Sequence, residues 1–246
     1  ECINFMVFSN DNPNSILNIV TKARENARSV QEHISRELWL CINNYYLLLT
    51  KKGVHKKLNE EEPIEFLDSL KAYHLMFYGT MDITQERGAS YYFMNIGKYL
   101  ERVIQITDFT GIKLTEIAKT SDSLEQSFYW KNLLLSIGGY HLYLKKHKSS
   151  FKEDHIITMV FQDKLFPRSI YYCINKLNRH VRQLIESGEL EKNNIEFLLG
   201  KLESTIKYTT IESINERGLE NFIKEIKEDI KNISFSINTV YFSHFN

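Results

Sequence analysis

Proline is scarce in this sequence, with only three among 246 residues. Each one, at Pro13, Pro63 and Pro167, stands where a helix could begin. Proline is tolerated at the first position of a helix because the N–H that it lacks has no partner there. The sequence also has no convincing period-two alternation and no hairpin turn signals, so it does not predict strands.

Cysteine is equally scarce, and the three cysteines show no CxxC or Cys/His metal spacing. The sequence therefore predicts no disulfide framework, and free thiols suit a reducing cytoplasm. No apolar run reaches the roughly 18 residues that a membrane span requires. Thirty-one basic residues balance thirty-one acidic ones, so the overall charge predicts neither nucleic acid nor an anionic membrane as a partner.

Motifs for catalysis and cofactor binding are also missing. The sequence has no GxSxG elbow, Walker loop or GxGxxG, and no glutamate has histidine three residues on. His33 and Glu37 are four residues apart, but one such pair is more typical of a surface contact than of a metal site. A Cys/His nucleophile stays open, although Cys41 and Cys173 both lie in apolar helical patterns. We therefore predict no metal and no cofactor.

Helical periodicity is what the sequence has in abundance. Apolar residues recur at steps of three and four from Ile16 to about Leu49, which predicts one helix over about 14–50, roughly 50 Å long. The same steps predict a second long helix over about 211–243. Between them, Gly138-Gly139 predicts a bend or a close-packing point.

These patterns together predict an all-α fold, a single multi-helix bundle with one long helix near each end. We expect one domain over residues 1–246. The first residues, ECINFMVF, lack the basic region of a signal peptide and do not begin with Met, so we interpret them as an internal starting point.

Arginine is placed in an unusual way. Nine arginines stand against 22 lysines, and five of the nine adjoin a glutamate. The doublets are Arg24-Glu25, Arg36-Glu37, Glu86-Arg87, Glu101-Arg102 and Glu216-Arg217. Adjacent helical residues point about 100° apart, so a doublet offers opposite charges to two different neighbours. This suits salt-bridge ladders between helices or a polar pocket, and a solvated face is the remaining alternative.

Three arginines suggest an anion site. Arg24 and Arg28 are four residues apart, which is mildly destabilising unless Glu25 and Glu32 neutralise them or an anion binds between them. Arg168 follows a proline in the first turn of a predicted helix, where the helix dipole disfavours a cation. A guanidinium beside free N–H groups there would make an anion seat.

Three stretches carry a resemblance to a known family: DNPNSILNIVTKARENARSVQEHISRELWLCIN, GASYYFMNIGKYLERVIQITD and FPRSIYYCINKL. Together they resemble, in the same order, the Alpha-E proteins, a bacterial helical family named for its Glu-Arg motif. Glu101-Arg102 matches the second Glu-Arg motif, residues 24–28 the RENAR stretch and residues 166–169 the FPRS stretch. The family pattern begins with a preceding segment that carries its own Glu-Arg motif, so the resemblance implies a domain truncated at its N-terminus.

Members of this family are encoded beside, or fused to, ATP-grasp-type ligases and transglutaminase-like peptidases. The resemblance therefore implies a non-catalytic accessory or binding subunit of a peptide-ligation or peptide-modification system, with these two enzymes as partners. Its candidate contacts for an anion or a partner are Arg24, Arg28, Arg102 and Arg168, oriented by Glu25 and Glu101.

Two alternatives stay open. The first is a ligase or transferase in which Glu101 acts as a general base, and this requires a sheltered carboxylate in a cavity. The second is a purely structural interaction protein, in which each Glu-Arg doublet bridges two helices.

Overall fold

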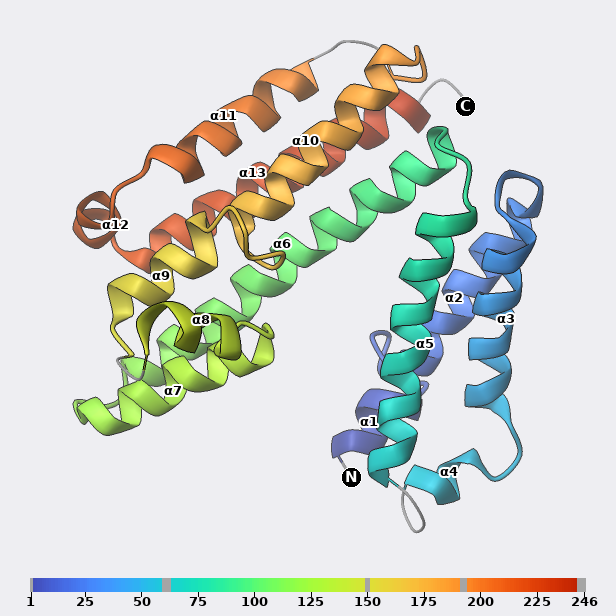
Figure 1. Ribbon diagram of the computed structural model, residues 1–246, viewed down its shortest axis with the longest axis horizontal. Helices are drawn as coiled ribbons and strands as arrows, with labels where there is room; N and C mark the ends of the chain where they lie inside the picture. Colours follow the sequence, from blue (N-terminus) through green and yellow to red (C-terminus); the bar gives the residue numbers. More distant parts are fainter. Residues whose placement is uncertain (1, 59–62, 149–150, 191–193, 243–246) are drawn as a thin grey trace. The chain divides into compact units, whose positions relative to one another are not determined.

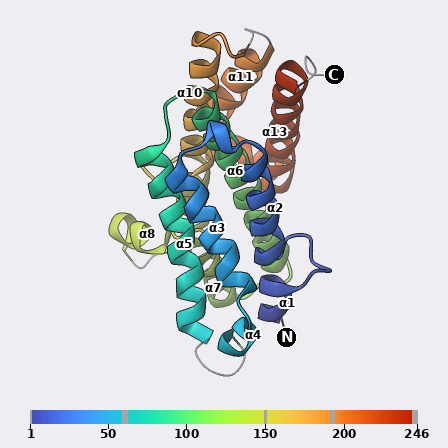
Figure 2. The same cartoon turned by 90° about the vertical axis from the view of Figure 1, so that its right-hand side faces the viewer.

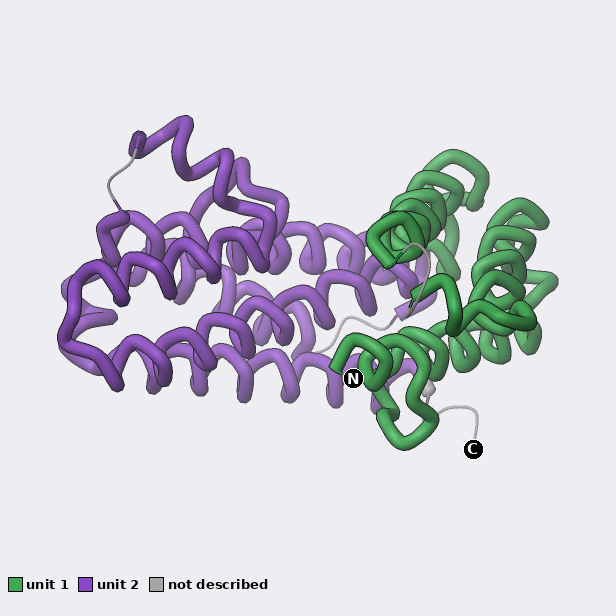
Figure 3. Tube along the Cα trace, turned by 90° about the horizontal axis from the view of Figure 1, so that it is seen from below, with its two compact units in different colours: residues 1–91 green, residues 92–246 purple. Residues whose placement is uncertain are grey.

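The computed structural model describes residues 2–58, 63–148, 151–190 and 194–242 (Figure 1). Helices and their connections account for all of these residues and none forms a strand, so the all-α prediction is confirmed. No helix in the described ranges is both long enough and apolar enough to cross a membrane. The chain divides into two compact units, residues 1–91 and residues 92–246 (Figure 3). The prediction of one domain stays a prediction.

Unit 1 is built on three neighbouring helices. They are α2 (Ile16–Ser29), α3 (Arg36–Thr50) and α5 (Pro63–Thr84), with the short helices α1 (Cys2–Phe8) and α4 (Val54–Lys56) beside them. Helix α3 packs against both α2 and α5 (Figures 1 and 2). One apolar cluster fills the space between these helices, made of Val7, Phe8, Val20, Leu49, Val54, Leu58, Phe66 and Leu70.

The prediction of one helix over 14–50 is wrong, because the chain turns back on itself between α2 and α3. Ser35 caps the new helix, its hydroxyl accepting the Leu38 N–H at 3.2 Å. The Gln85 side chain fastens the turn: it accepts the Ser35 N–H at 2.9 Å and donates to the His33 carbonyl at 2.9 Å. The apolar steps continue through the turn because both helices face one core, so periodicity alone does not reveal the break.

Unit 2 contains most of α6 and all the later helices. These are α6 (Ala89–Ile117), α7 (Ser123–Ser136), α8 (Tyr140–His147), α9 (Glu153–Gln162), α10 (Ile170–Glu186), α11 (Asn194–Tyr208), α12 (Ile211–Arg217) and α13 (Leu219–Phe242). Helix α11 packs against both α10 and α13 (Figure 1). Residues such as Ile170, Leu177, Ile195, Leu199 and Ile230 are fully buried there.

Glycines with positive φ break two helices that the sequence joins. The predicted helix over 211–243 is wrong as one element, because Gly218 adopts φ 85° between α12 and α13. Gly138, at φ 65°, separates α7 from α8, so the predicted bend is a complete break. Such left-handed backbone is accessible to glycine without steric cost, so each helix ends there.

The order of elements in unit 1 recurs in the second half of unit 2. In both α1–α5 and α9–α13, a proline turn follows the first helix, two helices follow the turn, and a short helix precedes a long one. The turns at Pro13 and Pro167 share their hydrogen bonds. Ser15 and Ser169 are both buried, and the backbone N–H of each donates at 2.9 Å to the carbonyl of the residue three positions earlier. The hydroxyl of each serine also caps the next helix by accepting the backbone N–H of the residue three positions later, at 3.2 Å for Ser15 and 3.0 Å for Ser169.

The two copies differ in how far their side chains are covered. Ile3 of α1 is 53% exposed, whereas Ile157, at the equivalent place in α9, is 1% exposed. Ile19 of α2 is 52% exposed and its counterpart in α10, Cys173, is 0% exposed. In unit 2, α9 packs against α7 and α8. The two halves therefore share the order of their helices and the hydrogen bonds of their proline turns, while the burial of matching side chains differs.

Candidate functional site

The six candidate residues fall into two groups. Arg24, Glu25 and Arg28 lie on α2 of unit 1, whereas Glu101, Arg102 and Arg168 belong to unit 2. Each group is described within its own unit.

In unit 1, Arg24 joins two helices through neutral partners. Its Nε donates to Asn43 Oδ1 on α3 at 2.8 Å, and its guanidinium lies 4.6 Å from the ring centre of Tyr46. Glu25 and Arg28 are exposed, and neither has an ion pair within the described ranges. Arg24 therefore links α2 to α3, and the pairing of Arg24 and Arg28 around one anion stays a prediction.

In unit 2, the two residues of the Glu101-Arg102 doublet on α6 contact different neighbours. Arg102 Nη1 donates to the carbonyl of Pro167 at 3.3 Å, in the turn before α10. Its guanidinium also lies 5.5 Å from the ring centre of Tyr99. Glu101 is exposed and accepts from Gln105 Nε2, one turn along α6, at 2.9 Å. The arginine thus reaches another element, while the glutamate stays on its own helix.

The turn that receives Arg102 is fixed by Asp163. Its Oδ1 accepts the N–H groups of Leu165 and Phe166 at 2.8 and 3.0 Å, and its other oxygen pairs with Lys146. Burial raises the pKa of this carboxyl, but Lys146 and the two N–H groups together bring the pKa below its ordinary value. The Ser169 hydroxyl donates to the Asp163 carbonyl at 2.5 Å and so closes the turn.

Arg168 leaves this turn on its exposed side and runs along Gly138. A Cβ at Gly138 would lie 3.6 Å from Arg168 Nη1, and a Cβ at Gly139 would lie 3.0 Å from Phe166 Cζ. The glycine pair is therefore a close-packing point for the turn, in line with one of the two interpretations of the sequence. Arg102 and Arg168, which are distant in sequence, are brought to the same turn.

Cys173 lies close enough to these cations for their charges to act on its thiol. It is fully buried, and its thiol donates to the Pro167 carbonyl at 3.7 Å. Burial raises the pKa of Cys173 to about 12, although the charges of Arg102, Arg168 and Lys98 act to lower it. We call Lys98, Arg102 and Arg168 the cationic seat. Cys173 itself stays a protonated thiol at neutral pH, so it is not a ready nucleophile.

Cys41, the other buried cysteine, offers no better nucleophile. It lies on α3 in unit 1, and burial raises the pKa of its thiol, with a hydrogen bond to Thr80 acting in the opposite direction. The Cys/His alternative therefore gains no support from either buried thiol.

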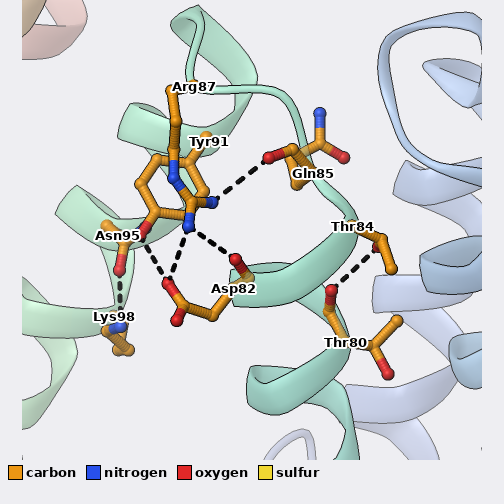
Figure 4. A network of polar contacts seen from close by, with 8 residues as sticks. All are labelled: Thr80, Asp82, Thr84, Gln85, Arg87, Tyr91, Asn95 and Lys98. Atoms are coloured by element: carbon orange, nitrogen blue, oxygen red, sulfur yellow. Dashed lines mark hydrogen bonds and ion pairs between the residues drawn. The ribbon is translucent and has the colours of Figure 1, made fainter.

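The arginines of the seat have no acidic partner in the part of the chain that the structure describes. Neither Arg102 nor Arg168 forms an ion pair with any residue that the structure describes. Lys98 donates to Asn95 Oδ1 at 2.5 Å, and Figure 4 shows this contact. Two guanidiniums without a carboxylate are suited to an anion that comes from outside, because arginine binds carboxylate and phosphate in bidentate fashion.

Among the described ion pairs, one of the other doublets links two helices and another stays local. Arg217 pairs with Glu225 at 3.1 Å and so links α12 to α13. Arg87 instead folds back on the end of α5, bonding the Asp82 carbonyl at 2.5 Å and pairing with its carboxylate at 3.2 Å (Figure 4). The hypothesis that every doublet bridges two helices therefore does not hold for the described part of the chain.

The positions of Glu101, His33 and Glu37 bear on the enzyme and metal alternatives. Glu101 is exposed, whereas a general base of the expected kind needs a sheltered carboxylate. His33 lies in a short 3-10 turn and Glu37 in α3, so they do not share one helix. The described residues contain no cluster of three or more potential metal ligands.

Lys98 is the residue of the seat that sequence reasoning missed. It stands four positions before Arg102, hence on the same face of α6, and this spacing was a readable signal. Asp163 and Gly138 were missed as supports of the seat, because their roles depend on contacts between different elements.

The comparison with family models gives one match. It is to a family described as a predicted alpha-helical domain with a conserved ER motif, and it covers residues 1–242. No curated protein and no solved structure matches the chain.

Proposed function

The chain belongs to the Alpha-E family, and on that premise we propose that it is a non-catalytic accessory or binding subunit of a bacterial peptide-ligation or peptide-modification system. Its partners in this proposal are an ATP-grasp-type ligase and a transglutaminase-like peptidase in the cytoplasm. The cationic seat holds an anionic peptide, a tag or a segment of one of these partners.

One observation carries the proposal. Arg102 and Arg168 come from different elements, meet at the Pro167 turn, and have no carboxylate partner in the described parts of the chain. Arginine binds carboxylate and phosphate in bidentate fashion, so two arginines that reach the same turn without a described carboxylate partner are suited to an anionic ligand.

The start of α10 adds to the attraction for an anion. The seat lies beside the first turn of this 17-residue helix, where the helix dipole places partial positive charge. Ser169 already occupies the Tyr172 N–H at 3.0 Å, so an anion would be held mainly by the guanidiniums. A carboxylate of an acidic peptide fits this arrangement, because it accepts two parallel N–H bonds from one arginine.

An enzyme is less well supported. The exposed Glu101 is engaged with Gln105 of its own helix, and the thiol of Cys173 is protonated and buried. The described residues of the seat therefore offer cations for binding, and the sheltered carboxylate in the same turn, Asp163, is already paired with Lys146 and two N–H groups.

Co-purification from the native host tests the partners. We expect a tagged chain to recover a ligase or a peptidase of the stated classes, identified by mass spectrometry. Replacement of Arg102 or Arg168 by Gln should abolish recovery, whereas Glu101→Gln should retain it. Recovery of the chain alone, or equal recovery with all three variants, would contradict the proposal.

A peptide titration tests the ligand class separately. Acetylated tetraglutamate with an amidated C-terminus should bind the purified chain, and tetraglutamine of the same form should not. We expect its affinity to fall about tenfold in Arg102→Gln and to weaken as salt is raised. Equal binding of both peptides would exclude the cationic seat as an anion site.

A further inference from the structure

A polar pocket of about 370 Å³ opens on the side of α10 that faces α11. Its lining is Asn175, Asn178, Arg179, Arg182, Gln183 and Glu186 of α10, with Glu203 of α11. It shares no residue with the cationic seat, and it lies entirely within unit 2. Its volume is within the range of small-ligand sites.

Amide groups hold both carboxylates of the pocket. Glu203 accepts from Asn175 Nδ2 at 3.1 Å and from Asn178 Nδ2 at 2.8 Å. Glu186 accepts from Gln183 Nε2 at 2.7 Å. The acidic side chains are therefore satisfied without the arginines, and the amides are oriented with their nitrogens toward the carboxylates.

Two kinds of group are left for a ligand. Arg179 and Arg182 are exposed and form no ion pair within the described residues, although two carboxylates line the same pocket. Asn178 is only 5% exposed, and its Oδ1 is buried without a hydrogen-bond partner in the described part of the chain. A buried acceptor of this kind is normally satisfied, so this oxygen marks a place for a donor.

We propose that this pocket binds the C-terminal residue of a peptide. The terminal carboxylate would lie against Arg179 and Arg182, and the amide N–H of the same residue would donate to Asn178 Oδ1. In a peptide terminus this N–H is two covalent bonds from the carboxylate carbon, so one residue presents the anion and the donor together. Capture of a terminal carboxylate is a recurrent mode of peptide recognition.

Simpler ligands satisfy only part of the pocket. An inorganic anion supplies charge to the guanidiniums but no N–H for Asn178, and an amidated peptide supplies the N–H but no charge. A C-terminal residue therefore has an advantage over both, which makes the proposal testable with small probes. The inference stands apart from the proposed function, because the tetraglutamate probe of the cationic seat has no free C-terminus.

The test is a titration of the full chain, labelled with ¹⁵N, followed by NMR. The probes are N-acetyl-glycylglycine, its C-terminal amide, and acetate. We expect N-acetyl-glycylglycine to shift signals of α10 and α11 in a saturable way, with at least about tenfold weaker binding of the other two. Equal binding of the three probes, or shifts confined to other elements, would overturn the proposal.

Substitutions separate the two halves of the site. Arg182→Gln, at an exposed position, should weaken N-acetyl-glycylglycine about tenfold, whereas Lys231→Gln, an exposed cation of α13 outside the pocket, should leave it unchanged. Asn178→Leu should remove the preference for N-acetyl-glycylglycine over acetate. If Asn178→Leu keeps that preference, or if Lys231→Gln weakens binding as much as Arg182→Gln, the assignment is wrong.

Discussion

The Nη1 atom of Arg102 lies 3.3 Å from the carbonyl oxygen of Pro167, 65 residues further along the chain. This bond fastens α6 to the turn that precedes α10. A guanidinium has five N–H donors, so the bond to Pro167 leaves donors for a second acceptor. One arginine can therefore hold two elements together and still bind a ligand.

Arg102 and Arg168 should differ in their effect on stability. We expect Arg102→Ala to lower the free energy of unfolding by about 1 kcal/mol, because a charge-assisted bond to the Pro167 carbonyl is lost. Arg168→Ala should change it by less than about 0.5 kcal/mol, because this exposed side chain has no hydrogen bond among those in the described ranges. Urea unfolding of both variants measures the difference, and equal losses would show that Arg102 has no structural role.

Two glycines of unit 2 should respond to alanine in opposite directions. Gly97 is exposed inside α6, and a Cβ added there would meet only open space, so Gly97→Ala should stabilise the protein by roughly 0.5–1 kcal/mol. Gly138 adopts φ 65°, so Gly138→Ala should destabilise it by about 1–2 kcal/mol. Thermal unfolding of the pair checks both signs, and a stabilised Gly138→Ala would refute the left-handed turn.

His180 should make unit 2 sensitive to acid. Burial lowers the pKa of His180 from its ordinary value of 6.5 to about 4, and the charges of Lys98, Arg179 and Lys176 add to the effect. The unfolded chain binds this proton first, so the contribution of neutral His180 is complete above pH 6.5 and is lost as the pH falls toward 4. We expect a loss of about 2 kcal/mol across that window.

The control for this prediction is His180→Phe, which removes the titrating group. Its free energy of unfolding should fall less steeply between pH 6.5 and 4 than that of the natural chain. The comparison uses slopes, so a change in packing around the new ring affects both ends of the window equally. Parallel profiles would show that another group is responsible.

The repeated helices provide a matched pair of isoleucines. Ile157 is 1% exposed in α9, so Ile157→Ala should cost about 2–5 kcal/mol by removing buried methyl groups and leaving a cavity. Ile3, at the equivalent place in α1, is 53% exposed, and Ile3→Ala should cost less than about 0.5 kcal/mol. Similar losses in urea unfolding would mean that the α1 face is covered as well as the α9 face.

Much of the fold was predictable from the sequence, because steps of three and four report which side of a helix faces a core. The positions at which the helices are interrupted were harder to predict from the sequence. Val30 and Ile34 keep the apolar steps going through the turn before Ser35, and the contacts of Gln85 that fasten this turn come from 50 residues away. Gly218, by contrast, follows Arg217 at the end of a helix and was a readable stop signal.

The sequence named the arginines of the candidate site, and their role there stays a prediction, but the sequence did not reveal which of them lie near each other. The family resemblance pointed to both Arg102 and Arg168, and the structure brings them to one turn. The same reasoning gave equal weight to Arg24 and Arg28. Their sequence context did not predict that Arg24 would donate a hydrogen bond to Asn43 on the next helix. Which arginines meet depends on tertiary contacts, and spacing along one helix does not report them.

The distance in sequence between Arg102 and Pro167 also has a consequence during synthesis. Residues 1–91 form a compact unit of their own, so they can fold as soon as they leave the ribosome. Helix α6 emerges next, but the turn that receives its arginine is 65 residues behind, roughly 3 to 13 seconds at ordinary elongation rates. During that interval the apolar face of α6 has nothing from α10 to cover it. A nascent chain with such an uncovered face is open to chaperones and to aggregation until residues 167–186 have been made.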